Sequence, residues 1–67
     1  MTTKDRPIID SVSYYRHTGV WCYSAWVGGE FDHSEPLDPA EVHTRFDAEA
    51  VLRTLFPAAI LRRLEDV

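Results

Sequence analysis

Three histidines and one cysteine are the side chains here with the chemistry for metal binding or nucleophilic catalysis. His17, His33 and His43 lack metal-site spacing, because the sequence has no Cys-x-x-Cys, His-x-x-x-His or His-Glu-x-x-His pattern. Cys22 and His33 fall on neighbouring predicted strands, but a nucleophilic pair also needs a third group that orients the histidine. Asp32 precedes His33 and is expected on the other side of its strand. We therefore interpret Cys22 as a small sheet residue.

Carboxylates between Glu30 and Asp38 supply the oxygen ligands that calcium prefers. The EF-hand pattern needs alternating acids, a mid-loop glycine and a closing glutamate, whereas His33 and Pro36 interrupt this run. Gly28-Gly29 does not indicate a phosphate loop, because no Lys-Ser/Thr follows it. No Ser-His-Asp arrangement stands out, and the chain is short for enclosing a substrate cavity. We predict no catalytic residue, no metal site and no cofactor.

The first half of the sequence has the pattern of a β-meander. Residues 8–16 and 20–27 are rich in β-branched and aromatic residues with polar residues between them, which is typical of strands. Thr18-Gly19 predicts a two-residue hairpin loop, and Gly28-Gly29 predicts a second loop that leads into a short strand at 30–34. We expect a three-stranded antiparallel sheet.

The register of the first hairpin can be predicted from its apolar face. A two-residue loop sets Tyr14 opposite Tyr23 and Val12 opposite Ala25, so that these side chains share one face. A shift by one residue sets Tyr14 against Cys22 and splits that face. We therefore predict the two-residue loop.

The second half of the sequence carries helix signals. Asp38-Pro39-Ala40-Glu41 combines an N-cap acid, a proline at the first helical position and a glutamate three residues after the cap, which predicts a helix over 39–46. A further cap at Asp47 predicts a helix over 47–56, and Pro57 opens a third over 57–65. The pattern leaves open whether the first two are separate or one bent helix. We expect these two or three short helices to pack on one face of the sheet.

The other face of the sheet is expected to stay uncovered. In the second hairpin, the predicted pairing sets Trp26 opposite Phe31 and Ser24 opposite His33. Tyr15, Trp26 and Phe31 then form an exposed aromatic cluster, and tryptophan and tyrosine are enriched at interface hot spots. The alternative is that the helices, or the segment from 30 to 37, cover this face. The predicted core face instead carries Val12, Tyr14, Trp21, Tyr23, Ala25 and Val27, packed on Val51, Leu52, Leu55, Ile60, Leu61 and Leu64.

Charge is unevenly distributed along the chain. The net charge is −4, and residues 30–49 carry seven acids and one base, which is −6. Such a field repels phosphate backbones and attracts basic surfaces, so direct nucleic-acid binding is not expected. The simpler interpretation is a solvated acidic segment that keeps the protein soluble. The predicted partner-binding residues are Tyr15, Trp26, Phe31, Glu30, Asp32, Glu35, Asp38 and Glu41.

These patterns together predict a small acidic, non-catalytic protein-binding domain. We expect an inhibitor or regulator that engages a basic protein, such as one that handles nucleic acid. Anti-CRISPR and anti-restriction proteins of phages and mobile elements are similar in size and charge alone, and no motif here assigns the chain to them. The alternative is a structural or accessory module that homodimerises or completes a larger complex.

Length and composition predict one domain in a reducing compartment. The chain has 67 residues, of which 1–7 are expected to be a disordered lead and 8–67 a single α+β domain. One cysteine cannot form an internal disulfide, which suits the cytoplasm. The sequence has no apolar run near the ~20 residues of a membrane span, and residues 1–7 lack the apolar stretch of a signal peptide. We predict a cytoplasmic protein without a membrane partner.

Overall fold

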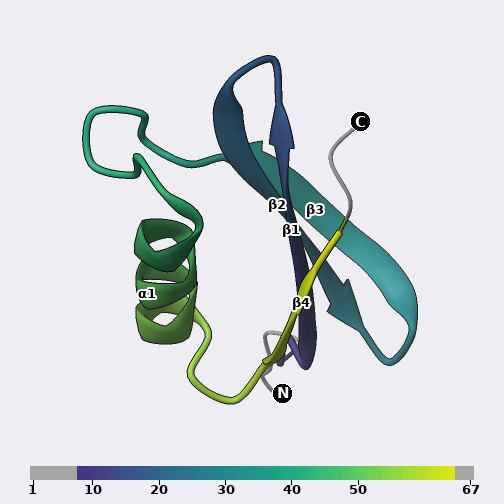
Figure 1. The fold of residues 1–67 in the computed structure, drawn as a ribbon. Helices are drawn as coiled ribbons and strands as arrows, with labels where there is room; N and C mark the ends of the chain where they lie inside the picture. The colour runs from purple at the N-terminus through teal and green to yellow at the C-terminus, as the bar shows by residue number, and fades with distance from the viewer. Residues whose placement is uncertain (1–7, 65–67) are drawn as a thin grey trace.

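The computed structural model describes residues 8–64, which form a four-stranded sheet and a helix. The elements in chain order are β1 (Ser11–His17), β2 (Val20–Val27), β3 (Glu30–Pro36), α1 (Arg45–Leu55) and β4 (Ile60–Arg63). The sheet order is β3-β2-β1-β4, in which β4 runs parallel to β1 and the other neighbours are antiparallel. Figure 1 shows α1 on one side of this mixed sheet.

The predicted architecture of three strands followed by two or three helices is wrong, most clearly at residues 57–65. Residues 60–63 of this segment form β4, which pairs with the edge of β1 from Ser11 to Tyr14. The Ile60 N–H donates to the Asp10 carbonyl at 3.0 Å, and the Leu64 N–H donates to the Tyr14 carbonyl at 2.9 Å. The apolar spacing in this short segment fits a helix or a strand, and the free edge of β1 supplies backbone partners that local pattern does not reveal.

The helix predicted over 39–46 is a single turn followed by an extended link. The Val42 N–H donates to the Asp38 carbonyl at 2.9 Å, and the Ala40 N–H donates to the Asp38 carboxylate at 2.9 Å. The turn does not continue, because Thr44 has an extended backbone with φ −129° and ψ 168°. Local signals for a helix start at Asp38 are thus satisfied by a turn alone.

The helix predicted over 47–56 is α1, and it begins two residues earlier than expected. Thr44 is its N-cap, and the Asp47 N–H donates to the Thr44 hydroxyl at 3.2 Å. The Asp47 carboxylate in turn accepts from the backbone N–H groups of Thr44, at 3.1 Å, and His43, at 2.9 Å. This is a reciprocal capping box. Asp47 is therefore the third residue of the helix instead of the cap itself.

The first hairpin has the predicted two-residue loop and register. Tyr14 pairs with Tyr23, and Val12 pairs with Ala25. Thr18 and Gly19 both have positive φ, of 51° and 80°. Such a loop matches the right-handed twist of the flanking strands, which explains the tight turn.

The second hairpin departs from the predicted register after its first pairs. Trp26 lies opposite Phe31, as expected, but the register shifts between Ala25 and Trp26. Asp32 is the extra residue of this β-bulge, and His33 consequently lies opposite Ala25 instead of Ser24. The bulge thereby moves His33 to the side of the sheet that faces α1.

The hydrophobic core lies between α1 and the sheet. Val12 and Leu52 are its largest fully buried side chains. Three residues predicted to pack in the core are instead exposed, Leu55 at 55%, Ile60 at 71% and Leu64 at 41%. Val27, also predicted for the core, is half-buried. The core residues are Val12, Tyr14, Trp21, Tyr23, Ala25, Leu37, Val42, Ala48 and Leu52.

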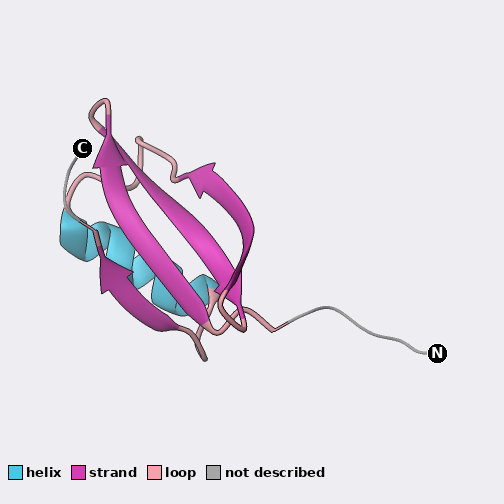
Figure 2. Ribbon diagram, turned by 90° about the vertical axis from the view of Figure 1, so that its right-hand side faces the viewer, coloured by secondary structure: helices cyan, strands magenta, loops and turns pink. Residues whose placement is uncertain are grey.

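The side of the sheet away from α1 is not covered by any helix or strand of residues 8–64. We call it the open face, and Figure 2 looks onto it with α1 behind the strands. The predicted lead at 1–7 lies outside the described residues, as do 65–67. Within residues 8–64, no helix has the length and apolar character to cross a membrane. The open face includes Ser13, Tyr15, Ser24, Trp26, Phe31 and Arg62.

Candidate functional site

Three predicted site residues project to the open face, and two of them are in contact. The rings of Trp26 and Phe31 have centroids 5.6 Å apart and planes at 78°, an edge-to-face contact. Phe31 is 56% exposed, whereas Trp26 and Tyr15 are half-buried. The Tyr15 hydroxyl lies 3.3 Å from the Ser34 hydroxyl, across β2. The structure thus places Tyr15, Trp26 and Phe31 on one surface, on the face where the sequence predicted them.

Small residues of β1 and β2 form the floor of the open face. Ser13 is 8% exposed, and Ser24 and Cys22 are half-buried. The Cys22 thiol donates to the Val20 carbonyl at 3.6 Å, and burial raises the pKa of this thiol. A raised pKa leaves less thiolate near neutral pH, which opposes a nucleophilic role. Because the bulge turns His33 to the other face, no imidazole from β3 serves Cys22 as a base.

A hollow of about 340 Å³ opens beside Trp26. Among the residues that the structure describes, Arg62 of β4 is the only charged one that lines it. The Trp26 indole N–H has less than 1 Å² exposed and no hydrogen-bond partner in the described part of the chain. An unsatisfied buried donor costs about 1–3 kcal/mol. The sequence does not reveal this feature, because its pattern over 57–65 predicts a helix instead of the strand that brings Arg62 to the hollow. The lining residues are Ser11, Ser13, Trp26, Gly29, Arg62 and Leu64.

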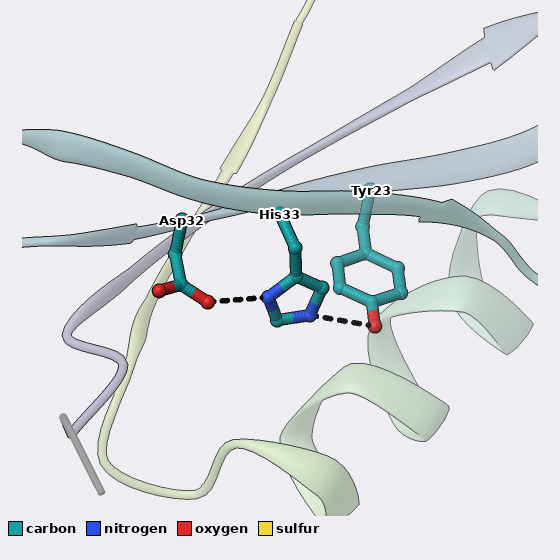
Figure 3. Close-up of polar contacts among 3 residues, drawn as sticks. All are labelled: Tyr23, Asp32 and His33. Carbon is teal, nitrogen blue, oxygen red and sulfur yellow. Dashed lines mark hydrogen bonds and ion pairs between the residues drawn. The ribbon is translucent and has the colours of Figure 1, made fainter.

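The acids of β3 do not join the aromatic residues on the open face. Glu35 lies opposite Tyr23, and Glu30 lies opposite Val27, so both side chains project on the side of α1. Asp32 projects to that side as well (Figure 3). All three acids are exposed. They form an acidic margin along the free edge of β3.

The two remaining predicted acids, Asp38 and Glu41, lie in the connection between β3 and α1 and are exposed. The Glu41 N–H donates to the Asp38 carbonyl at 3.1 Å, so both belong to the same turn. They extend the acidic margin away from the open face. The predicted site is therefore divided, with aromatic residues on one face and acids along one edge.

Asp32, His33 and Tyr23 form a chain of polar contacts on the α1 side of the sheet (Figure 3). Nδ1 of His33 lies 2.6 Å from the Asp32 carboxylate, and Nε2 lies 3.3 Å from the Tyr23 hydroxyl. Asp32 was expected on the opposite side of its strand from His33, and that expectation is wrong because of the bulge. Both residues of a bulge can project toward the same side of the sheet.

This Asp-His-Tyr chain has the group order of a proton relay, but its chemistry points to a structural role. Burial, followed by the negative charge of Glu35, raises the pKa of Tyr23 and keeps its phenol protonated. Tyr23 is 6% exposed, and its ring packs between His33 and Phe56 at centroid distances of 5.7 and 5.5 Å. A substrate has little access to such a hydroxyl. The contacts fix the bulge in place.

No group of three His, Cys, Asp or Glu residues within 8–64 lies close enough together to hold a metal ion. No protein-family model, curated protein or solved structure matches this chain. The case for a function therefore rests on the chemistry of the open face, the hollow and the acidic margin.

Proposed function

We propose that this chain is a small, non-catalytic protein-binding domain that docks on its partner through the open face. The observation that carries this proposal is the one-sided cover of the sheet. Helix α1 packs on one face, and the other face presents Tyr15, Trp26 and Phe31. These residues leave an aromatic surface that an interface would bury.

The composition of the open face supports this proposal. Tryptophan, tyrosine and arginine are the residue types enriched at interface hot spots, and here they are Trp26, Tyr15 and Arg62. No acidic residue of the four strands points to this face. Depletion of acids is a second property of interface centres. The serines between the aromatic residues provide adaptable hydrogen bonding, as in antibody paratopes.

The acidic margin indicates that the surface of the partner is positively charged. Glu30 and Asp32 flank Phe31 along β3, so basic groups on a partner that covers Phe31 reach these acids around the sheet edge. The net charge of −4 favours encounter with a basic protein. A basic surface that otherwise holds nucleic acid fits these requirements. We therefore propose an inhibitor or regulator of such a protein, acting in the cytoplasm.

Capture of a partner from the native host tests this proposal. Immobilised wild-type protein, Phe31→Ala and Phe46→Ala serve as parallel baits. Phe46 is the matched control, because it is 68% exposed like Phe31 but lies on α1, beside Arg45. A protein retained by wild type and Phe46→Ala but lost with Phe31→Ala supports the open face as the docking surface. Equal retention by all three baits contradicts it.

A homodimer through the open face is the rival interpretation, and exposed Ile60 and Leu64 beside the aromatic residues favour it. Sedimentation equilibrium distinguishes the two. Binding to another protein predicts a monomer at micromolar concentration. A dimer that dissociates on Phe31→Ala substitution, but not on Phe46→Ala, assigns the face to self-association instead.

A further inference from the structure

We infer that the hollow beside Trp26 binds a carboxylate group of the protein partner, with Arg62 as the cation that holds it. This inference rests on the proposed function, since it names the chemical group that the open face recognises. The hollow lies on the same face as Phe31, so a partner that docks there also covers the hollow.

Hydrogen-bond donors predominate among the side chains that line the hollow. Arg62 supplies N–H donors and has no acceptor, and the Trp26 indole is likewise a donor only. The hydroxyls of Ser11 and Ser13 can donate as well. No carboxylate of residues 8–64 lines the hollow. The serine hydroxyls can also accept, so the cationic donor Arg62 is the group that distinguishes between ligands, and it favours an anion that accepts hydrogen bonds.

The indole N–H of Trp26 is a hydrogen-bond donor that lacks an acceptor among the described residues. It is also shielded from solvent. A carboxylate has two oxygens, so it can accept from Arg62 and from a neighbouring neutral donor at once. Leu64 and the Trp26 ring offer apolar contact to the carbon atoms that carry the carboxylate.

A carboxylate fits this site better than a phosphate. The described lining of the hollow has one cationic residue and otherwise neutral ones, which suits a single negative charge. Phosphate groups carry up to about two charges and are commonly bound by clusters of arginines. The net charge of −4 also repels polyanions such as nucleic acids.

Arg62 and the acidic margin lie at opposite edges of the sheet. Arg62 belongs to β4, and Glu30 and Asp32 belong to β3, with β1 and β2 between them. A complementary partner presents its carboxylate over β4 and its basic groups beside β3. This order of charges fixes the orientation in which the partner docks.

The test uses three probes of similar shape in an NMR titration of the ¹⁵N-labelled chain at constant ionic strength. Phenylacetate carries the carboxylate, phenylacetamide is its neutral match, and phenyl phosphate carries the competing anion. The indole N–H signal of Trp26 reports on the hollow. The indole of Trp21, which is buried on the α1 side, is the reference in the same spectrum.

We expect phenylacetate to shift the Trp26 signal in a saturable manner and to bind about tenfold more tightly than phenylacetamide, the effect of one charge-assisted hydrogen bond. Arg62→Gln should weaken phenylacetate binding about tenfold. Arg63→Gln is the matched control, because Arg63 pairs with Tyr14 and projects to the other side of β4. This variant should change the affinity for phenylacetate less than about twofold. Equal binding of phenylacetate and phenylacetamide, or no effect of Arg62→Gln, overturns the inference.

Two further outcomes would reassign the hollow. Phenyl phosphate binding about tenfold tighter than phenylacetate would make it a phosphate site. Glu65 and Asp66 follow Leu64 in the sequence, so a Glu65→Gln, Asp66→Asn variant tests the chain's own carboxylates. A tenfold gain in phenylacetate affinity in that variant would show that they occupy the site and would remove the partner's role.

The proposed function and this inference fail separately. If the probes do not bind but Phe31→Ala still loses its partner, only the carboxylate assignment is wrong. If phenylacetate binds as expected but no captured protein depends on Phe31, the docking proposal is wrong. The hollow is then an anion site of another kind, and the assignment of its ligand to a protein partner is overturned.

Discussion

The ring of Phe31 meets the indole of Trp26 edge to face, 5.6 Å between centroids, on the side of the sheet that α1 leaves uncovered. The two residues are directly opposite one another on β2 and β3, immediately before the bulge at Asp32. Cross-strand aromatic pairs stabilise the register of neighbouring strands. This pair therefore has two roles that can be measured separately, in folding and in binding.

A double-mutant cycle measures the folding role. Trp26→Ala, Phe31→Ala and the double variant should show a coupling free energy of about 0.5–1.5 kcal/mol in urea unfolding, the typical value of an aromatic pair. Each single variant should still fold, since neither residue belongs to the core between α1 and the sheet. Additive effects of the two substitutions would show that the ring contact does not stabilise the fold.

The sequence predicted the first hairpin correctly because its signals are local. Thr18-Gly19 can adopt the positive φ angles of the loop, and one register alone brings Tyr14 and Tyr23 onto a shared apolar face. The bulge at Asp32 has no such signal, because an extra residue in β3 alters neither the turn nor the alternation before it. The shared face of Tyr15, Trp26 and Phe31 was therefore predicted correctly, whereas His33 was assigned to the wrong face.

The fourth strand and Arg62 could not be predicted from local pattern. Residues 57–65 are too short for apolar spacing to decide between a helix and a strand. The deciding interaction is with β1, more than 40 residues earlier in the chain. Since Arg62 reaches the hollow only as part of β4, its place in the candidate site depends on that long-range pairing. The division between acids and aromatic residues likewise follows from the β2–β3 register.

Neutralising the acidic margin should slow association with a basic partner. In Glu30→Gln, Glu35→Gln, Glu41→Gln protein, we expect an association rate about tenfold lower at low salt and a nearly unchanged dissociation rate. Kinetic binding measurements against the captured partner, repeated at rising ionic strength, check this. Arg53→Gln is the control, because it changes an exposed charge on α1 in the opposite sense and should not slow association. Equal association rates for the triple variant and wild type would exclude electrostatic steering.

The capping box should contribute measurably to the stability of α1. Thr44→Ala removes the hydroxyl that accepts from the Asp47 N–H and should cost about 1 kcal/mol in urea unfolding. Thr54→Ala is the matched control, because Thr54 is exposed within the helix and donates only to the Ala50 carbonyl. Alanine has the higher helix propensity there, so that variant should be neutral or slightly stabilised. Equal losses at both positions would contradict the capping role.

Stability should decrease at alkaline pH. Burial is the main cause that raises the pKa of Tyr14 and of Tyr23, with smaller contributions from Glu49 and Glu35 respectively, and burial raises the pKa of Cys22 too. These groups lose protons more readily in the unfolded chain, so the unfolded state binds fewer protons as pH rises and becomes favoured. Unfolding free energies measured by urea should be constant near pH 8 and fall above about pH 9–10, the range of the free groups. A Tyr14→Phe, Tyr23→Phe variant should show a shallower fall, and an unchanged slope would assign the pH dependence to other groups.

Adjacent residues of β4 should differ sharply in their effect on stability. Leu61 is half-buried against the core, whereas Ile60 is 71% exposed on the opposite side of the strand. Leu61→Ala should therefore cost about 1–2 kcal/mol of unfolding free energy, and Ile60→Ala about 0.5 kcal/mol or less. Urea unfolding of the two variants gives both values directly. In the helix expected from the sequence, both side chains would lie on the apolar stripe, so equal losses would contradict a strand here. The same result would also displace Arg62 from the open face, since the two-residue alternation of β4 is what brings Arg62 to the hollow and sends Arg63 to the other side.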